Sequence, residues 1–313
     1  MTKLAYVFPG QGSQEVGMLQ DDADAVATIF SEASEALGYD LWALVASGPE
    51  EQLNQTEFTQ PALLTASVAL YRLALQRGAP IPDIVAGHSL GEYSALVAAG
   101  VLEFADAVKL VQKRGQFMQT AVPVGEGGMA AVLGLSDAEV IDVCKAASDA
   151  ATGDIVQAAN FNAPGQVVIA GKNAALERAI EGCKEAGARR AMALAVSAPF
   201  HSQLMEPAAE EMKSALAEVT FKKPAIQLMQ NVDATVHDDP EAIRANLVSQ
   251  MSGAVLWTAT VENMKAIGVE RMVECGPGKV LSGLAKRIDK SIVGVNIDSG
   301  ESIGTAIESL NGN

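Results

Sequence analysis

Short apolar runs alternate with longer stretches of helical periodicity along most of the chain. The apolar runs span residues 4–8, 84–87, 226–230, 271–275 and 292–296. The helix-like stretches span residues 61–77, 90–99, 104–121, 240–250, 258–267 and 279–288. This alternation is typical of a mainly parallel sheet covered by helices on both faces. Ligands bind at the carboxyl ends of the strands in such sheets, and residues 10–12 and 87–89 follow two of these ends.

The pattern changes in the middle of the chain. A glycine-rich break, VPVGEGGMAAVLGL at residues 122–135, leads into a strand, and Ser136, Asp137 and Glu139 are typical of a helix start. Further on we expect strands near 155–161 and 166–170, a helix over 173–186 and a strand over 189–196. This β-α-β-β-α-β order is that of a ferredoxin-like module.

Size and composition agree with one large domain and a smaller companion. The chain has 313 residues, of which 49% are hydrophobic, so it can bury a large core. We predict a ferredoxin-like subdomain at residues 125–196, inserted into a discontinuous α/β domain formed by residues 1–124 and 197–313.

The sequence shows none of the usual signals for secretion, membrane insertion or disulfide formation. The N-terminal apolar run is too short for a signal peptide, and no apolar stretch approaches the roughly 20 residues that span a bilayer. The three cysteines, Cys144, Cys183 and Cys275, form no C-x-x-C pair. These features predict a cytoplasmic protein that does not enter a membrane.

The charge balance is acidic. Twenty-two basic residues against 38 acidic ones leave a formal charge of −16, which argues against nucleic-acid binding. An anionic ligand or partner would need local positive charge. The densest basic clusters are Lys109, Lys113 and Arg114, then Arg189 and Arg190, then Lys279, Lys286 and Arg287.

The segment Gly87-His88-Ser89-Leu90-Gly91 fits G-x-S-x-G between a predicted strand and a predicted helix. In that context the pattern indicates a nucleophile elbow, with Ser89 at the helix N-terminus and the amide of Leu90 facing a developing oxyanion. A tight turn that only needs a small polar residue is the alternative.

A nucleophilic serine needs a base, and the chain has three histidines. His88 adjoins Ser89 in a sharp turn, where neighbouring side chains diverge, so we expect it to support the site. His237 lies beside two acidic residues and is expected in an exposed loop. His201, where the chain re-enters the large domain, remains as the candidate base.

The first loop, FPGQGSQEVG, offers a second oxyanion donor in the backbone around Gln11. It is not a dinucleotide fingerprint because Glu15 replaces the last glycine, nor a Walker loop because Met18 replaces the lysine. A glycine turn that closes the first strand is equally compatible with these residues.

Arg114 lies on a helix whose apolar positions face inward. A guanidinium held there could bind a carboxylate through two parallel hydrogen bonds. An arginine beside a lysine is also typical of a solvated helix face, and the residues alone do not choose.

Segments that match the sequence motifs of one protein family occur along nearly the whole chain. They are FPGQGSQ at 8–14, TQPALLTASVALY at 59–71, GHSLGEYSAL at 87–96, KRGQFMQ at 113–119, NFNAPGQVVIAG at 160–171, APFH at 198–201, NVDA at 231–234, Gln250, and GPGKVLSGLAKRI at 276–288. Together they resemble the malonyl-CoA:acyl carrier protein transacylases, the acyltransferases of fatty acid synthesis. The resemblance implies a hydrolase-like α/β domain with a ferredoxin-like insert.

The resemblance also implies roles for single residues. Ser89 would be the nucleophile, His201 the general base and Arg114 the binder of the malonyl carboxylate. The main-chain carbonyl of Gln250 would orient the histidine.

Further residues match positions that line or support the family's site. The amides of Gln11 and Leu90 would form the oxyanion hole, and Asn160 and His88 would line or support the cavity. Phe200 matches a bulky residue that disfavours branched acyl groups. Ala254 stands where the family commonly has proline, which leaves the loop after Gln250 in question.

The activity implied is malonyl transfer from malonyl-CoA to the phosphopantetheine thiol of acyl carrier protein, through a malonyl-serine and without a metal or redox cofactor. An esterase or thioesterase that uses water is the rival reaction, and a non-catalytic carrier-binding or CoA-binding scaffold is a third reading. We expect a monomer that docks the acidic carrier protein on four basic residues: Arg189, Arg190, Lys286 and Arg287.

Overall fold

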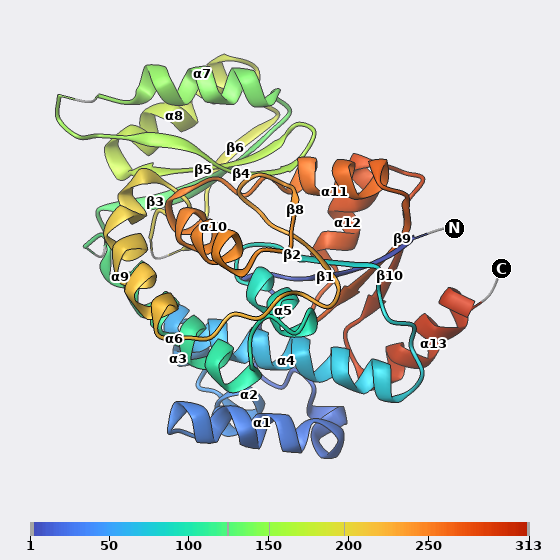
Figure 1. Ribbon diagram of the computed structural model, residues 1–313. Helices are drawn as coiled ribbons and strands as arrows, with labels where there is room; N and C mark the ends of the chain where they lie inside the picture. Colours follow the sequence, from blue (N-terminus) through green and yellow to red (C-terminus); the bar gives the residue numbers. More distant parts are fainter. Residues whose placement is uncertain (1–2, 124, 150, 197, 312–313) are drawn as a thin grey trace.

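The computed structural model describes residues 3–123, 125–149, 151–196 and 198–311. Figure 1 shows two sheets, a larger one in the centre of the molecule and a smaller one that lies over it as a separate layer. Among the described residues, no helix combines the length and the apolar composition needed to cross a bilayer.

The larger sheet has strand order β10-β9-β1-β2-β7-β8, and its strands are parallel except for the antiparallel edge strand β8. Its strands are β1 Lys3–Phe8, β2 Ile84–Gly87, β7 Gln227–Met229, β8 Val236–His237, β9 Val269–Cys275 and β10 Val293–Ile297. The central strands are apolar on both faces, as expected of parallel strands covered by helices on two sides.

Helices pack on both faces of this sheet because side chains alternate along its strands (Figure 1). Tyr6 and Phe8 point into one apolar core, whereas Ala5 and Val7 point into the other. The first core is formed with α1 Ala23–Leu37, α2 Leu41–Ser47, α3 Glu50–Leu53, α4 Thr56–Gln76, α5 Gly91–Ala98, α6 Phe104–Thr120, α9 Glu206–Ala217, α10 Pro240–Ser252 and α13 Gly300–Asn311. The second core is formed with α11 Trp257–Ala266 and α12 Val280–Ile288.

The smaller sheet is antiparallel, with strand order β4-β5-β3-β6. Its elements are β3 Gly127–Leu133, α7 Asp137–Ala147, β4 Val156–Ala163, β5 Gln166–Lys172, α8 Asn173–Glu185 and β6 Arg190–Ala193. Helices α7 and α8 cover one face, and the other faces the large core, where Met129 and Val168 pack. Ser136 and Glu139 form the reciprocal capping box predicted for α7.

The predicted fold class is confirmed: a mainly parallel sheet domain carries a ferredoxin-like subdomain. All elements of the smaller sheet fall within the predicted insert, whose boundaries remain a prediction. The sequence pattern missed α1, α2, α3, α9 and α13, the two-residue strand β8, and the short 3-10 turns Gln20–Asp22 and Gln203–Met205.

Candidate active site

Ser89 lies on a sharp turn between β2 and α5. A methyl group added at Gly87 would lie 1.9 Å from the carbonyl carbon of Gly91, and one added at Gly91 would lie 2.0 Å from the Phe8 carbonyl oxygen. Only glycine therefore permits the start of α5 to sit this close to β1. Ser89 itself has a positive φ of 52°, a strained conformation that its surroundings impose.

His201 is the histidine that contacts Ser89. Its Nε2 lies 2.7 Å from Ser89 Oγ, and its Nδ1 lies 2.9 Å from the main-chain oxygen of Gln250. A carbonyl oxygen only accepts, so Nδ1 carries the proton and donates it, which leaves Nε2 free to accept from the serine hydroxyl. The contact with the Gln250 carbonyl is the one that the family resemblance implies.

The protonation state of His201 follows from its surroundings. The side chain is 3% exposed, and burial together with the Arg114 guanidinium lowers the pKa of His201 to about 3, against the opposing effect of the Gln250 carbonyl. The imidazole is therefore neutral at pH 7, the form that can take a proton from a hydroxyl.

Arg114 is buried on α6 and is only 1% exposed, so it is not part of a solvated helix face. Its Nη1 donates to Gln60 Oε1 at 3.0 Å. Its Nη2 donates to Ser89 Oγ at 3.1 Å and to Gln250 Oε1 at 2.9 Å. The guanidinium also lies over the ring of Tyr93, 5.6 Å from its centroid. A permanent positive charge thus touches the serine hydroxyl directly.

The predicted oxyanion donors lie on the same cavity as Ser89. Gln11, in the loop after β1, and Leu90, directly after the serine, both line it. Over the described ranges, the amide N–H of neither residue has an acceptor within the protein. Two unpaired N–H groups beside a hydroxyl are what an oxyanion hole requires.

The cavity has a volume of about 430 Å³ and lies between the two sheets. The larger domain contributes Ser89, Arg114 and His201, and the smaller sheet contributes residues that include the predicted Asn160. Phe200, directly before the histidine, also lines the cavity.

His88 supports the elbow and does not contact the serine hydroxyl in the part of the chain described. Its Nε2 lies 2.8 Å from Asn162 Oδ1 on β4, and its ring packs against Trp257 at 5.6 Å between centroids. It therefore links the elbow to the small sheet.

His237 lies away from the cavity on β8, where its Nε2 contacts Asp233 Oδ2 at 2.6 Å. It is half-buried on a short edge strand, so the predicted exposed loop is wrong in detail. The strand forms because Val236 and His237 pair with the end of β7.

The loop after Gln250, in which Ala254 replaces the family's proline, is bonded to β4. The next residue, Val255, donates from its amide to the Ala159 carbonyl and accepts from the Phe161 amide, both at 2.9 Å. These two bonds attach the loop to β4.

Three polar residues at the site were missed as functional candidates from the sequence: Gln60, Glu92 and Asn231. Gln60 contacts Arg114, and the amide of Gln250 donates to Glu92. Asn231 Oδ1 accepts from the Ser89 amide at 2.7 Å. Each lies inside a family-like segment, and that position was the only available signal.

The four predicted docking residues do not line the cavity. Arg189, Arg190, Lys286 and Arg287 are all exposed. Arg189 and Arg190 belong to the small-sheet subdomain, and Lys286 and Arg287 to α12. Arg287 connects α12 to the small sheet by donating a hydrogen bond to Gln166, at the start of β5.

Comparison with known proteins gives consistent matches over the full length. The family model described as acyl transferase domain matches residues 5–312. The malonyl CoA-acyl carrier protein transacylase of Escherichia coli K12 is 54% identical over 311 residues, which cover 98% of this chain and 100% of that protein.

Solved structures agree in fold. The malonyl CoA-acyl carrier protein transacylase of Coxiella burnetii matches with a TM-score of 0.96 and 46% identity, covering 99% of this chain and 98% of that one. A malonyl-transacylase solved in complex with a type II PKS acyl-carrier protein matches with a TM-score of 0.95 and 50% identity, covering 98% and 100%. The resemblance seen in the sequence is thereby confirmed, and the chain belongs to the acyl transferase family.

Proposed function

We propose that this protein transfers the malonyl group of malonyl-CoA to the phosphopantetheine thiol of an acyl carrier protein, supplying malonyl units for fatty acid synthesis. One observation carries the proposal: Ser89 Oγ is contacted both by a neutral imidazole, His201, at 2.7 Å and by a buried guanidinium, Arg114, at 3.1 Å. A hydrolase would need the first contact only.

The short distance between serine and guanidinium suits a malonyl group. In a malonyl thioester a single methylene separates the free carboxylate from the carbonyl that is attacked. The carboxylate binder must therefore lie next to the nucleophile, as Arg114 lies next to Ser89. Arg114 lines the cavity beside Ser89, so a carboxylate of the bound acyl group can reach its guanidinium.

In the first step, His201 Nε2 takes the Ser89 proton while Oγ attacks the thioester carbonyl. The resulting oxyanion accepts hydrogen bonds from the amides of Gln11 and Leu90. Collapse breaks the carbon–sulfur bond, CoA leaves with the proton from His201, and a malonyl-serine ester remains.

The second step repeats this chemistry with the carrier thiol. His201 takes the thiol proton, the thiolate attacks the serine ester, and the serine oxygen leaves with that proton. The two substrates thus react in turn at one site, and the reaction as proposed uses only groups of a single copy of this chain. No metal or redox cofactor takes part in either step.

Phe200 is proposed to limit the acyl group. It is buried, lines the cavity and directly precedes His201. Its ring reduces the room for a branch on the methylene, which favours malonyl over methylmalonyl.

The carrier is proposed to dock on the exposed cluster of Arg189, Arg190, Lys286 and Arg287. Two contacts support a single patch: Leu133 pairs with Arg190 on β6 and with Gln166 on β5, and Gln166 accepts from Arg287. Positive charge from α12 and β6 therefore gathers at one end of the small sheet. A relative solved with its acyl-carrier protein supports a carrier partner.

The nucleophile assignment predicts that Ser89→Ala abolishes the mass gain that malonyl-CoA produces, because no oxygen remains to form the ester. Intact-mass spectrometry before and after adding phosphopantetheinylated carrier measures loading and transfer. Ser94→Ala, a buried serine on the same helix, serves as the matched control and should load normally. Loss of the adduct to water without carrier would favour a hydrolase, and no adduct in the native protein would contradict both enzymes.

If Arg114 binds the malonyl carboxylate, Arg114→Ala should slow malonyl loading about 10- to 100-fold, because a hydrogen bond to a charged group is lost. Acetyl loading should change far less, since acetyl has no carboxylate. Rapid-quench mass spectrometry with each thioester gives both rates. Lys113→Ala, an exposed neighbour on α6, controls for helix effects, and equal losses with both thioesters would refute a carboxylate role.

The neutral imidazole predicts that the His201 ring resonances do not titrate between about pH 5 and about pH 8, because its pKa lies well below the ordinary value near 6.5. NMR titration, with the signal assigned by its loss in His201→Gln, measures this directly. A midpoint near 6.5 would mean that the base is charged in mildly acidic solution and would overturn the assignment.

The docking patch predicts that Arg190→Glu with Lys286→Glu raises the KM for carrier several-fold and weakens its salt dependence, since rim charges govern encounter rates. Loading from malonyl-CoA should be unchanged. Steady-state transfer assays at two salt concentrations measure the effect. Lys145→Glu with Lys184→Glu, two exposed lysines on α7 and α8, is the charge-matched control. Equal losses in loading and transfer would count against a carrier-specific patch.

A further inference from the structure

Glu92 is a buried carboxylate next to the elbow that the proposed reaction does not use. It lies in the first turn of α5 and is 1% exposed. Three donors converge on it: Gln230 Nε2 on Oε1 at 2.9 Å, and the Asn231 amide and Gln250 Nε2 on Oε2, each at 3.0 Å. A carboxylate taken this far from water needs such partners to remain charged.

The two residues bound to Oε2 also hold the backbone of the elbow. Asn231 accepts from the Ser89 amide at 2.7 Å and donates to the Gly87 carbonyl at 2.6 Å. Gln250 Nε2 donates to the Ser89 carbonyl at 3.1 Å. Both main-chain polar groups of the strained serine are thus bonded to side chains of residues that also donate to one carboxylate oxygen, Asn231 from its main-chain amide and Gln250 from its side chain.

The Gln250 amide continues from Glu92 to the guanidinium. Its NH₂ end donates to Glu92 and to the Ser89 carbonyl, so its oxygen must point the other way, where it accepts from Arg114 Nη2 at 2.9 Å. An amide has one donor end and one acceptor end, so fixing the first fixes the second. Carboxylate, amide and guanidinium form one oriented row.

The charges at the ends of this row favour each other. Burial raises the pKa of Glu92 to about 7, while its hydrogen bonds and the Arg114 guanidinium oppose that rise. Burial likewise lowers the pKa of Arg114, and Tyr93 and Glu92 oppose it. Each buried ion therefore makes the charged form of the other less costly.

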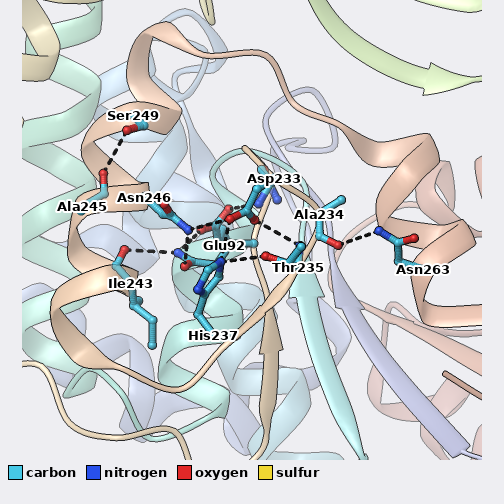
Figure 2. A network of polar contacts seen from close by, with 12 residues as sticks. Glu92, Asp233, Ala234, Thr235, His237, Ile243, Ala245, Asn246, Ser249 and Asn263 are labelled. Carbon is cyan, nitrogen blue, oxygen red and sulfur yellow. Dashed lines mark hydrogen bonds and ion pairs between the residues drawn. The ribbon is translucent and has the colours of Figure 1, made fainter. Parts of the chain in front are cut away.

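A second set of contacts orients Gln230, the residue that donates to Glu92 Oε1. Figure 2 shows Glu92 together with Asp233, Asn246 and His237 in a single polar network. Asn246 Nδ2 donates to Gln230 Oε1 at 3.0 Å, and it lies 3.3 Å from Asp233 Oδ2, which also contacts His237. This fixes the orientation of the Gln230 amide, so its NH₂ end faces Glu92.

We propose that Glu92 is a positioning residue that orients the Arg114 guanidinium through Gln250 and holds the Ser89 elbow through Asn231, and thereby sets selectivity for an acyl group with a free carboxylate. The proposal rests on the proposed function, because selectivity for malonyl has meaning only if the protein loads acyl groups on Ser89.

Only the ionised carboxylate matches the three donors. Its two oxygens accept from all of them, whereas a glutamine offers one oxygen and a donor NH₂ group. In Glu92→Gln at least one of Gln230, Asn231 and Gln250 faces another donor. If Gln250 turns to relieve this contact, its oxygen leaves Arg114.

We expect Glu92→Gln to lower the ratio of malonyl to acetyl loading rates on the order of 10-fold, the loss of one hydrogen bond to a charged group. Rapid-quench mass spectrometry of the Ser89 adduct measures both rates. Glu274→Gln is the matched control: this carboxylate is equally buried and accepts from the Leu281 and Ser282 amides at the start of α12. It should cost stability and leave the ratio unchanged.

The pH dependence of the native protein tests the same idea without a variant that could fail to fold. The ratio should fall as Glu92 takes up a proton below about pH 7 and should be flat in Glu92→Gln. Among the charged or titratable groups that face Glu92, Arg114 stays charged, Tyr93 has its pKa raised by burial, and His201 acts on both thioesters equally. His237, at the outer end of the network, is tested by His237→Gln, which should keep the native profile.

The outcomes separate the two proposals. A native protein that forms no malonyl adduct overturns the proposed function and this inference with it. Normal loading with an unchanged ratio in Glu92→Gln, or a native ratio that does not vary with pH, overturns the inference alone. An equal fall in both loading rates would mean that Glu92 supports the elbow or the fold without setting selectivity, and it also overturns the inference.

Discussion

The site depends on how closely α5 approaches the end of β1. Gly91 lies against the Phe8 carbonyl with no room for a side chain, and Gly87 lies equally close to Gly91. That approach forces the backbone of Ser89 into a positive φ and turns its hydroxyl into the cavity. It also carries the first turn of α5 into the interior, which is why Glu92, in that turn, is buried.

Burying these groups has a large electrostatic cost, and the structure meets it by pairing. Three side chains at or next to the cavity are almost inaccessible to solvent: Arg114, Glu92 and His201. The guanidinium and the carboxylate favour each other's charge, and the same guanidinium disfavours a charge on the imidazole. The result is a site with a fixed cation, a neutral base and, behind them, a buried carboxyl group whose ionised form the cation favours.

The cavity takes its shape from the packing of the large sheet domain against the small sheet. The cavity is lined from below by the large sheet domain and from above by the small antiparallel sheet, so its depth comes from the packing of the two. The His88 bond to Asn162 and the Val255 bonds to β4 attach both the elbow and the loop after Gln250 to the small sheet. The position of that sheet therefore affects the shape of the cavity and the geometry of the histidine.

Local sequence patterns determined much of this protein. The strand-glycine-serine-glycine-helix order of residues 84–98 predicts the elbow, because backbone sterics leave few alternatives there. Elimination among three histidines singled out His201. Helix and strand periodicity predicted both sheets but missed α1, α2, α3, α9 and α13, whose stability depends on the cores that they cover.

Only the tertiary structure decided which polar residues are buried and how they are paired. Arg114 follows a lysine on an amphipathic helix, and nothing local distinguishes a solvated position from a buried one. Its bond to Gln250 spans 136 residues, and that of Glu92 to the Asn231 amide spans 139. Pairing over such distances is set by how whole elements pack, because hydrogen bonds depend on positions in space that no short stretch of sequence specifies.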